Sequence, residues 1–152
     1  MENTIGSTRE IEETGNYLQL FIYRAPKKNH DALTKNLMQF VPWFKKNGAR
    51  VEYYQLGKSE TQGAIDSAKK SGMDILDSID KTLSTDGDEE EVWIEQQHFR
   101  DHKHCEEVFA NMMQDKSIEP LGNEFFGLVT QGKKLITGGF IRLERRNHNS
   151  FN

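Results

Sequence analysis

The chain has 152 residues and a formal net charge of −4 at pH 7. This length is typical of one domain that buries its own core. Its apolar runs are far shorter than the roughly 20 residues that cross a bilayer, so we expect neither a signal peptide nor a membrane span. The single cysteine, Cys105, cannot form an internal disulfide, which makes the cytoplasm the expected compartment.

Charge is distributed unevenly along the chain. Acidic residues predominate in 60–91, and basic residues predominate in 133–146. The basic stretch is short, whereas a protein that binds duplex nucleic acid usually carries a broader basic surface. We therefore expect no nucleic-acid partner and no membrane partner.

Residues 1–16 are predicted to form a flexible arm, because they offer few apolar side chains to a core. The next segment, YLQLFIYR, has the composition of a strand. Alternation places Leu18, Leu20 and Ile22 on one face and aromatic residues on the other, so both faces are apolar. Such a strand should be covered on both sides, once by helices of its own domain and once by something else.

A helix is predicted next, with Asn29 as its N-cap and apolar residues at helical spacing up to Phe44. Pro42 lies within this pattern and removes one backbone hydrogen bond, which predicts a kink or an early break. Gly48 predicts the helix end. The second strand is predicted in ARVEYYQL, residues 49–56.

Residues 57–88 are predicted to be an acidic insertion. Its apolar residues recur at spacings of three and four, which indicates one amphipathic helix that Gly72 interrupts. Its outer face would be acidic. Two interpretations are open: a solvated insertion that lies on the domain, or an element that docks a partner. We favour the first.

The third strand is predicted in EVWIEQ, residues 91–96, followed at once by a helix from Phe99 to Met113. Residues 117–134 are predicted to form a loop. LITGGFIRL, residues 135–143, is predicted to be the last strand, and its paired glycines indicate a bulge or a close backbone approach.

The predicted order of strands and helices is that of a ferredoxin-like split βαβ sandwich, an α+β fold with a four-stranded antiparallel sheet. We expect a single domain over residues 17–144, followed by a tail at 145–152.

Four segments resemble the YbaA-like proteins, a bacterial family of uncharacterised function. They are YLQLFIYRAPKKN (17–29), VPWFKKNGA (41–49), VWIE (92–95) and GKKLITGGF (132–140). The resemblance implies a dimeric α/β barrel, in which the sheets of two copies face each other. This homodimer agrees with the apolar character of both faces of the first strand. The resemblance implies no particular reaction.

Three potential metal ligands lie close together in HFRDHKHC, residues 98–105. On one helix His98, His102 and Cys105 would share a face, and imidazole and thiolate are suitable zinc ligands. However, His98 stands at the predicted helix start, and Cys105 belongs to the apolar arc, where a buried free cysteine is ordinary. His104 is expected on the polar side. We therefore favour no metal site and predict no cofactor.

The aromatic face of the predicted sheet offers candidate ligand-pocket residues, because an apolar cavity with a few polar groups is the usual composition of a small-molecule site. Glu95 could act as a base if it is buried. The alternative, which we favour, is that this face only packs in the dimer, with tyrosine hydroxyls paired across the interface and Glu95 beside an arginine. The candidates are Gln19, Tyr23, Trp93 and Glu95.

No phosphate-binding loop and no nucleophile with a neighbouring base can be recognised, so whether the protein is an enzyme stays open. The best hypothesis is a dimeric small-molecule-binding protein, or a minor enzyme, with a pocket at the sheet face. The alternative is a non-catalytic protein-interaction or stress-associated protein that uses the acidic insertion.

Overall fold

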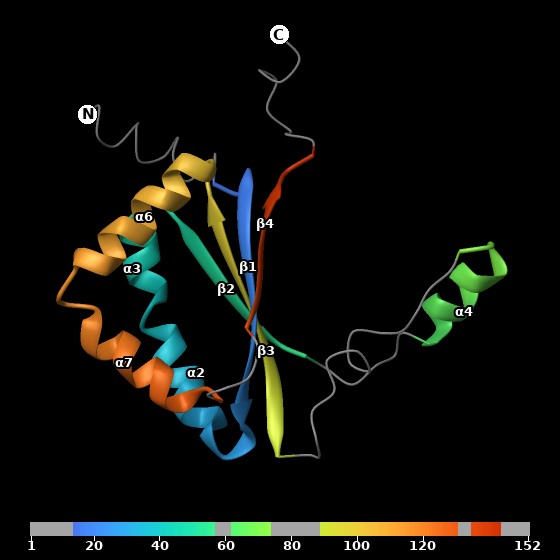
Figure 1. The fold of residues 1–152 in the computed structure, drawn as a ribbon, viewed down its shortest axis with the longest axis horizontal. Coiled ribbons are helices and arrows are strands. Elements are labelled where there is room, and N and C mark those ends of the chain that lie inside the picture. Colours follow the sequence, from blue (N-terminus) through green and yellow to red (C-terminus); the bar gives the residue numbers. More distant parts are fainter. Residues whose placement is uncertain (1–13, 57–61, 74–88, 131–134, 144–152) are drawn as a thin grey trace, which may run out of the picture.

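The structure is a computed structural model that describes residues 14–56, 62–73, 89–130 and 135–143. Strands and helices alternate along the chain (Figure 1). In order they are β1 (Tyr17–Pro26), the short 3-10 helix η1 (Lys27–Asn29), α2 (His30–Met38), α3 (Val41–Lys46), β2 (Arg50–Gln55), α4 (Gln62–Lys70), β3 (Glu90–Phe99), α6 (His102–Gln114), α7 (Glu119–Leu128) and β4 (Ile136–Ile141).

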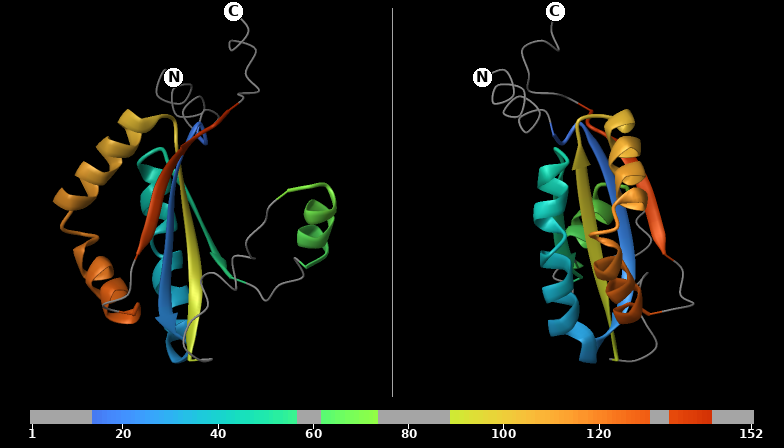
Figure 2. Two further views of the ribbon diagram at one scale, coloured as in Figure 1. Left: turned by 45° about the vertical axis from the view of Figure 1, so that its right-hand side comes forward. Right: turned by 90° about the vertical axis from the view of Figure 1, so that its left-hand side faces the viewer.

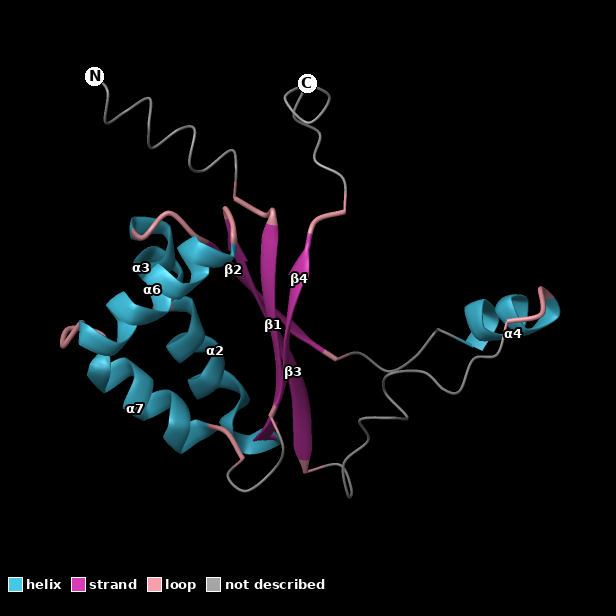
Figure 3. Ribbon diagram, turned by 45° about the horizontal axis from the view of Figure 1, so that its top comes forward, coloured by secondary structure: helices cyan, strands magenta, loops and turns pink. Residues whose placement is uncertain are grey.

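The four strands form one antiparallel sheet in the order β2-β3-β1-β4. Helices α2, α3, α6 and α7 all cover the same face of this sheet, whereas α4 lies apart on the other side (Figures 1, 2 and 3). This topology confirms the α+β, ferredoxin-like sandwich. No helix within the described ranges is long and apolar enough to cross a membrane.

The register of the strands sorts side chains between the two faces, because directly paired residues in an antiparallel sheet point to the same side. Tyr53, Glu95 and Phe21 form one row across β2, β3 and β1 on the helix-covered face. The neighbouring row on that face contains Trp93 and Tyr23. The predicted alternation in β1 and β3 is therefore confirmed.

None of the described helices covers the opposite face. One apolar row runs across all four strands, and its members are Tyr54, Ile94, Ile22 and Ile136. The next two rows are apolar on β1 but polar on β2 and β3, where they contain Glu52, Gln96, Arg50 and His98. We refer to this surface as the open face.

The core lies between the sheet and the four helices. One buried cluster contains Phe44, Phe99 and Val108, which join α3, β3 and α6. A second cluster packs Leu33 and Leu37 of α2 against Tyr23 and Trp93 of the sheet. Burial of large apolar side chains of this kind stabilises a fold by about 1.5–3 kcal/mol each.

The predicted break at Pro42 is confirmed, because α2 ends at Met38 and Pro42 lies in the first turn of α3. A proline is tolerated there because the first amides of a helix have no intrahelical acceptor. Asn29 precedes α2, but its side chain does not cap the helix. Instead, Asn29 Nδ2 donates a hydrogen bond of 2.9 Å to the carbonyl of Leu128. Gly48 ends α3 with φ of 77°, as predicted.

The helix predicted to start at Phe99 was placed too early. β3 continues to Phe99, because the four residues after Ile94 pair with both neighbouring strands, and α6 begins only at His102. Asp101 is its N-cap and accepts a hydrogen bond of 2.7 Å from the amide of His104.

Residues 117–134 were predicted to be a loop, and this was wrong for most of them, because 119–128 form α7. Helix propensity is low in this segment, which contains Gly122 and Gly127, so its helical state depends on tertiary contacts. It packs against α2 through Asn36, whose Nδ2 donates to the carbonyl of Leu121 at 3.1 Å and to Glu124 Oε1 at 2.7 Å.

The paired glycines of β4 mark a close backbone approach. Pairing with β1 continues without a bulge from Ile136 to Ile141, and a Cβ at Gly139 would overlap the hydroxyl of Tyr17. In the predicted insertion, α4 ends just before Gly72, whose φ is 87°. Residues 1–13 of the arm predicted at 1–16, residues 57–61 and 74–88 of the insertion, and the tail predicted at 145–152 lie outside the described residues. The end of the predicted arm is bound to the domain, because the amides of Gly15 and Asn16 donate to the carbonyl of Phe99 at 3.0 and 3.1 Å.

Candidate ligand-binding cavity

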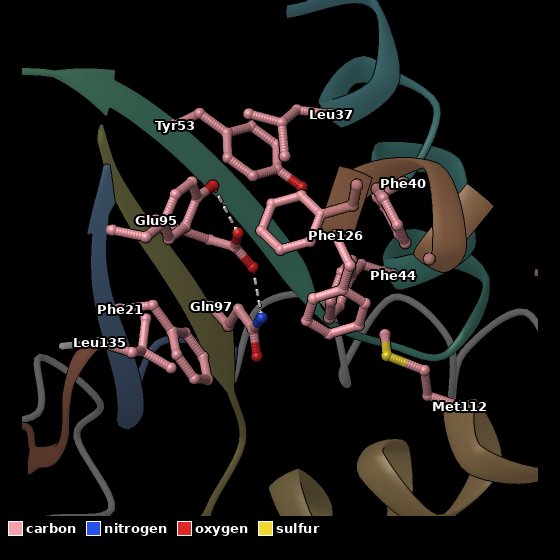
Figure 4. Close-up of a pocket in the computed structure, with 13 residues that line it drawn as sticks. Phe21, Leu37, Phe40, Phe44, Tyr53, Glu95, Gln97, Met112, Phe126 and Leu135 are labelled. Carbon is pink, nitrogen blue, oxygen red and sulfur yellow. Dashed lines mark hydrogen bonds between the residues drawn. The ribbon is translucent and has the colours of Figure 1, made fainter. Parts of the chain in front are cut away.

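A cavity of about 220 Å³ lies between the helix-covered face of the sheet and the helices (Figure 4). The strands provide its polar groups, Glu95 and Gln97, together with Phe21 and Tyr53. The helices provide apolar walls, among them Leu37, Phe44, Met112 and Phe125. A mostly apolar hollow with a few convergent polar groups is the usual form of a small-molecule site.

The sheet register explains why the polar groups converge. Glu95 and Gln97 are two residues apart in β3, so both side chains point toward the helices. Tyr23 lies diagonally from Glu95 on β1, and its hydroxyl donates a hydrogen bond of 2.9 Å to Glu95 Oε1. Gln97 Nε2 donates a hydrogen bond to Glu95 Oε2. Both carboxyl oxygens therefore have an internal donor.

Glu95 is only 8% exposed. This burial raises the pKa of its carboxyl above the ordinary value of 4.5, although the hydrogen bonds from Gln97 and Tyr23 oppose the shift. Burial also raises the pKa of the phenols of Tyr23 and Tyr53, and the nearby Glu95 adds to both shifts. No lysine, arginine or histidine is among the described residues that line the cavity. The carboxyl therefore faces the cavity without a cationic partner.

Gln97 has one polar atom with no hydrogen-bond partner among the described residues. Its side chain is buried, with Nε2 bonded to Glu95, and Oε1 is left unpaired. An unpaired buried acceptor costs about 1–3 kcal/mol of stability. A ligand that donates to this oxygen would recover that free energy.

The four candidate pocket residues separate into two pairs. Tyr23 and Glu95 are hydrogen-bonded to each other and line the cavity. Gln19 does not line it, because Gln19 Oε1 accepts from the hydroxyl of Tyr17 at 3.1 Å and Nε2 donates to Thr137 at 2.9 Å. Trp93 is also outside the lining, and its ring contacts that of His30.

The three candidate metal ligands do not share a helix face, because His98 belongs to β3. Its side chain lies on the open face, where Nε2 is 3.1 Å from Glu52 Oε1. His102 lies at the start of α6, 3.6 Å from Glu106, and Cys105 is buried in the core. No group of three potential ligands occurs within the part of the chain that the structure describes.

His104 was expected on the polar side of α6, and this was wrong. The side chain is buried, with Nδ1 accepting from the amide of Arg100 at 3.1 Å and Nε2 lying 2.9 Å from the carbonyl of Asn47. The ring therefore connects the start of α6 to the end of α3.

Gln97 and the α7 residues of the cavity wall were missed at the sequence level. Gln97 could have been found by extending the alternation of β3 by two residues beyond Glu95. Phe125 and Phe126 fall within the segment that was predicted to be a loop, because its two glycines hide the helical periodicity.

Comparison with family models and with curated proteins finds no match. Two proteins are among the solved structures that match this chain. SnoaB, a cofactor-independent oxygenase from Streptomyces nogalater, has a TM-score of 0.47 and 11% identity, and the match covers 87% of this chain and 98% of SnoaB. The de novo designed protein Foldit4 has a TM-score of 0.41 and 8% identity, covering 83% of this chain and 97% of Foldit4. The resemblance to the YbaA-like family stays a prediction.

Proposed function

We propose that this protein binds a small, mostly apolar molecule in the cavity between the sheet and the helices. The observation that carries the proposal is the buried Glu95–Gln97 pair at the wall of an aromatic cavity. A structural core gains nothing from an acid without a cationic partner, since burying a polar group costs free energy that an apolar residue would avoid.

The volume of the cavity suits a ligand with one or two small rings. An apolar protein cavity of about 150 Å³ is large enough to hold benzene, and this cavity is about 220 Å³. The aromatic side chains of Phe21, Phe44 and Phe125 would pack against a planar ligand.

We place the protein in the cytoplasm, because its single Cys105 is free and needs no oxidising compartment.

The proposal is tested by filling the cavity. Gly122 of α7 lines it, and a Cβ at this position meets no other atom within 4 Å. Gly122→Leu should therefore place its side chain in the cavity. Gly127 is on the same helix, also has open space at Cβ and does not line the cavity, so Gly127→Leu is the matched control.

We expect toluene and indene to raise Tm and to shift amide NMR signals in the wild type and in Gly127→Leu, because a ligand that binds only the native state stabilises it. Gly122→Leu should lose both effects. If neither probe changes Tm or the NMR spectrum of the wild type, the proposed function is wrong.

We also propose that two copies pair through the open face. Three large apolar residues of this face, Tyr54, Ile136 and Phe140, are 49%, 44% and 52% exposed. A contiguous apolar surface of this kind is unusual on a monomer and is typical of an interaction site. A second copy is the partner that we propose, because the row Tyr54–Ile94–Ile22–Ile136 crosses the whole sheet and can pack on itself about a two-fold axis.

A further inference from the structure

The amide of Gln97 stands between Glu95 and the cavity, and its two ends differ in chemistry. One end donates to Glu95 Oε2, and the other end, Oε1, has no partner among the described residues. In Figure 4 the side chain extends from β3 into the space enclosed by the helices, with its nitrogen on Glu95. Gln97 lines the cavity, but Oε1 itself is buried, so a ligand that bonds to this end of the amide has to displace the side chains that cover it.

The oxygen and nitrogen of a glutamine amide have nearly the same size, so the group can turn by 180° without a change in packing. Which end faces Glu95 depends on what the carboxyl can accept or donate. An ionised carboxylate only accepts hydrogen bonds, so the amide nitrogen of Gln97 must face it. A protonated carboxyl can donate from Oε2, so the amide oxygen of Gln97 must then face it.

Tyr23 holds the other carboxyl oxygen in both states. Its hydroxyl donates to Glu95 Oε1, and that oxygen accepts whether or not Oε2 carries a proton. When Glu95 takes up a proton from water, the change is therefore confined to Oε2 and to the amide of Gln97.

Glu95 is the group near the cavity whose charge can change above pH 4.5, because burial raises the pKa of its carboxyl above that ordinary value. The titratable groups that face it are the phenols of Tyr23 on β1 and Tyr53 on β2, and burial raises the pKa of both, so they stay neutral. The side chains that the described parts of α2, α3, α6 and α7 contribute to the lining are apolar. Further along β3, Glu91 lies two residues from Trp93, and its Oε1 is 2.9 Å from His30 Nδ1.

We propose that Glu95, acting through the amide of Gln97, selects the polar group of the ligand. With Glu95 ionised, Gln97 presents its oxygen to the cavity and favours an uncharged ligand that donates a hydrogen bond. With Glu95 protonated, Gln97 presents its nitrogen and favours an uncharged ligand that accepts one. This inference rests on the proposed binding of a small molecule in the cavity.

Three probes of similar shape separate the two states. Indole only donates a hydrogen bond, 1-indanone only accepts one, and indene does neither. We would measure the Kd of each probe by calorimetry from pH 4.5, the ordinary value for a glutamate, to about pH 9, where tyrosines are still neutral.

For the wild type we expect the ratio of the indole and 1-indanone affinities to rise about tenfold or more with pH, because one hydrogen bond is exchanged for an unpaired buried group. The affinity for indene should not change. If indene binds but the ratio is constant across this range, the inference is wrong and the proposed function stands. If indene does not bind, the proposed function itself is wrong.

Two variants test the role of Glu95. In Glu95→Gln the new amide can donate to Gln97 Oε1 as a protonated carboxyl would, so 1-indanone should be favoured at every pH. In Glu95→Met the titrating group is removed, so the ratio of the two affinities should be the same at every pH. A pH-dependent ratio in either variant would overturn the proposal, and Glu95→Met provides the test even if Glu95→Gln does not fold.

Discussion

At the scale of single residues, Glu95 is the side chain whose burial has the clearest energetic consequence. Burial raises its pKa above the ordinary 4.5, so the native state binds a proton over a pH range in which the unfolded state has lost it. In that range the free energy of unfolding falls as pH rises, because the native state binds more protons than the unfolded state. Below the pKa of Glu95 in the unfolded state, the carboxyl is protonated in both states and this loss of stability is absent.

We therefore expect Glu95→Gln to be more stable than the wild type at neutral pH, by roughly 1–3 kcal/mol, because a buried charge without a cation is replaced by a neutral group. The two proteins should converge as pH falls toward 4.5. Urea unfolding at several pH values measures this difference. Glu107→Gln, at an exposed position of α6, is the control and should follow the wild type.

Period-two alternation correctly predicted the faces of residues 17–23 in β1 and 92–95 in β3, which placed Tyr23 and Glu95 on one face. It could not separate Gln19 from Gln97, although these two are directly paired across β1 and β3. Their difference depends on neighbours that are distant in the sequence, since Thr137 of β4 occupies the amide of Gln19. Only the fold supplies that contact.

At the scale of secondary structure, α7 shows how a tertiary contact can compensate for a low helix propensity. Its Pro120 stands in the first turn, where proline is tolerated, and Asn36 of α2 hydrogen-bonds to it at two points. Asn36 is 1% exposed, so these bonds are sheltered from water. No periodic pattern within 119–128 reveals them, which is why the sequence alone suggested a loop.

We expect Asn36→Leu to destabilise the protein by about 1–3 kcal/mol, because the half-buried carbonyl of Leu121 and the carboxylate of Glu124 lose their donor. The loss of stability should be greatest in α7. Hydrogen exchange should become faster in α7 before it does in the sheet. Gln39→Leu, at an exposed position next to α2, should leave α7 protected. Equal loss of protection in all elements would argue against this role of Asn36.

At the scale of the whole molecule, the sheet is covered by helices on one face only. The sequence predicted the order of the strands along the chain and the need for cover on both faces of β1. It could not show what covers the second face, because apolar residues signal burial without naming the partner. The polar half of the open face, with Glu52 and His98, was also not apparent before the register was known.

The proposed dimer predicts a species of twice the 17.6 kDa chain mass in sedimentation experiments at micromolar concentration. Ile94→Lys should shift the equilibrium to the monomer, since an unpaired lysine would be buried at the centre of the apolar row. Met113→Lys is the control, because Met113 is 84% exposed on α6, on the helical side of the sheet. A wild type that sediments as a monomer would contradict the proposed pairing.

The position of Gly122 has a consequence for how this cavity could change. The absence of a side chain on α7 leaves room there, whereas the polar group that meets a ligand belongs to β3. Alanine, valine and leucine at this position would reduce the volume of the cavity in steps, while Gln97 and its neighbours stay unaltered. Ligand size and ligand polarity are thus controlled from two separate elements, so either preference could be redesigned, or could have diverged, without disturbing the other.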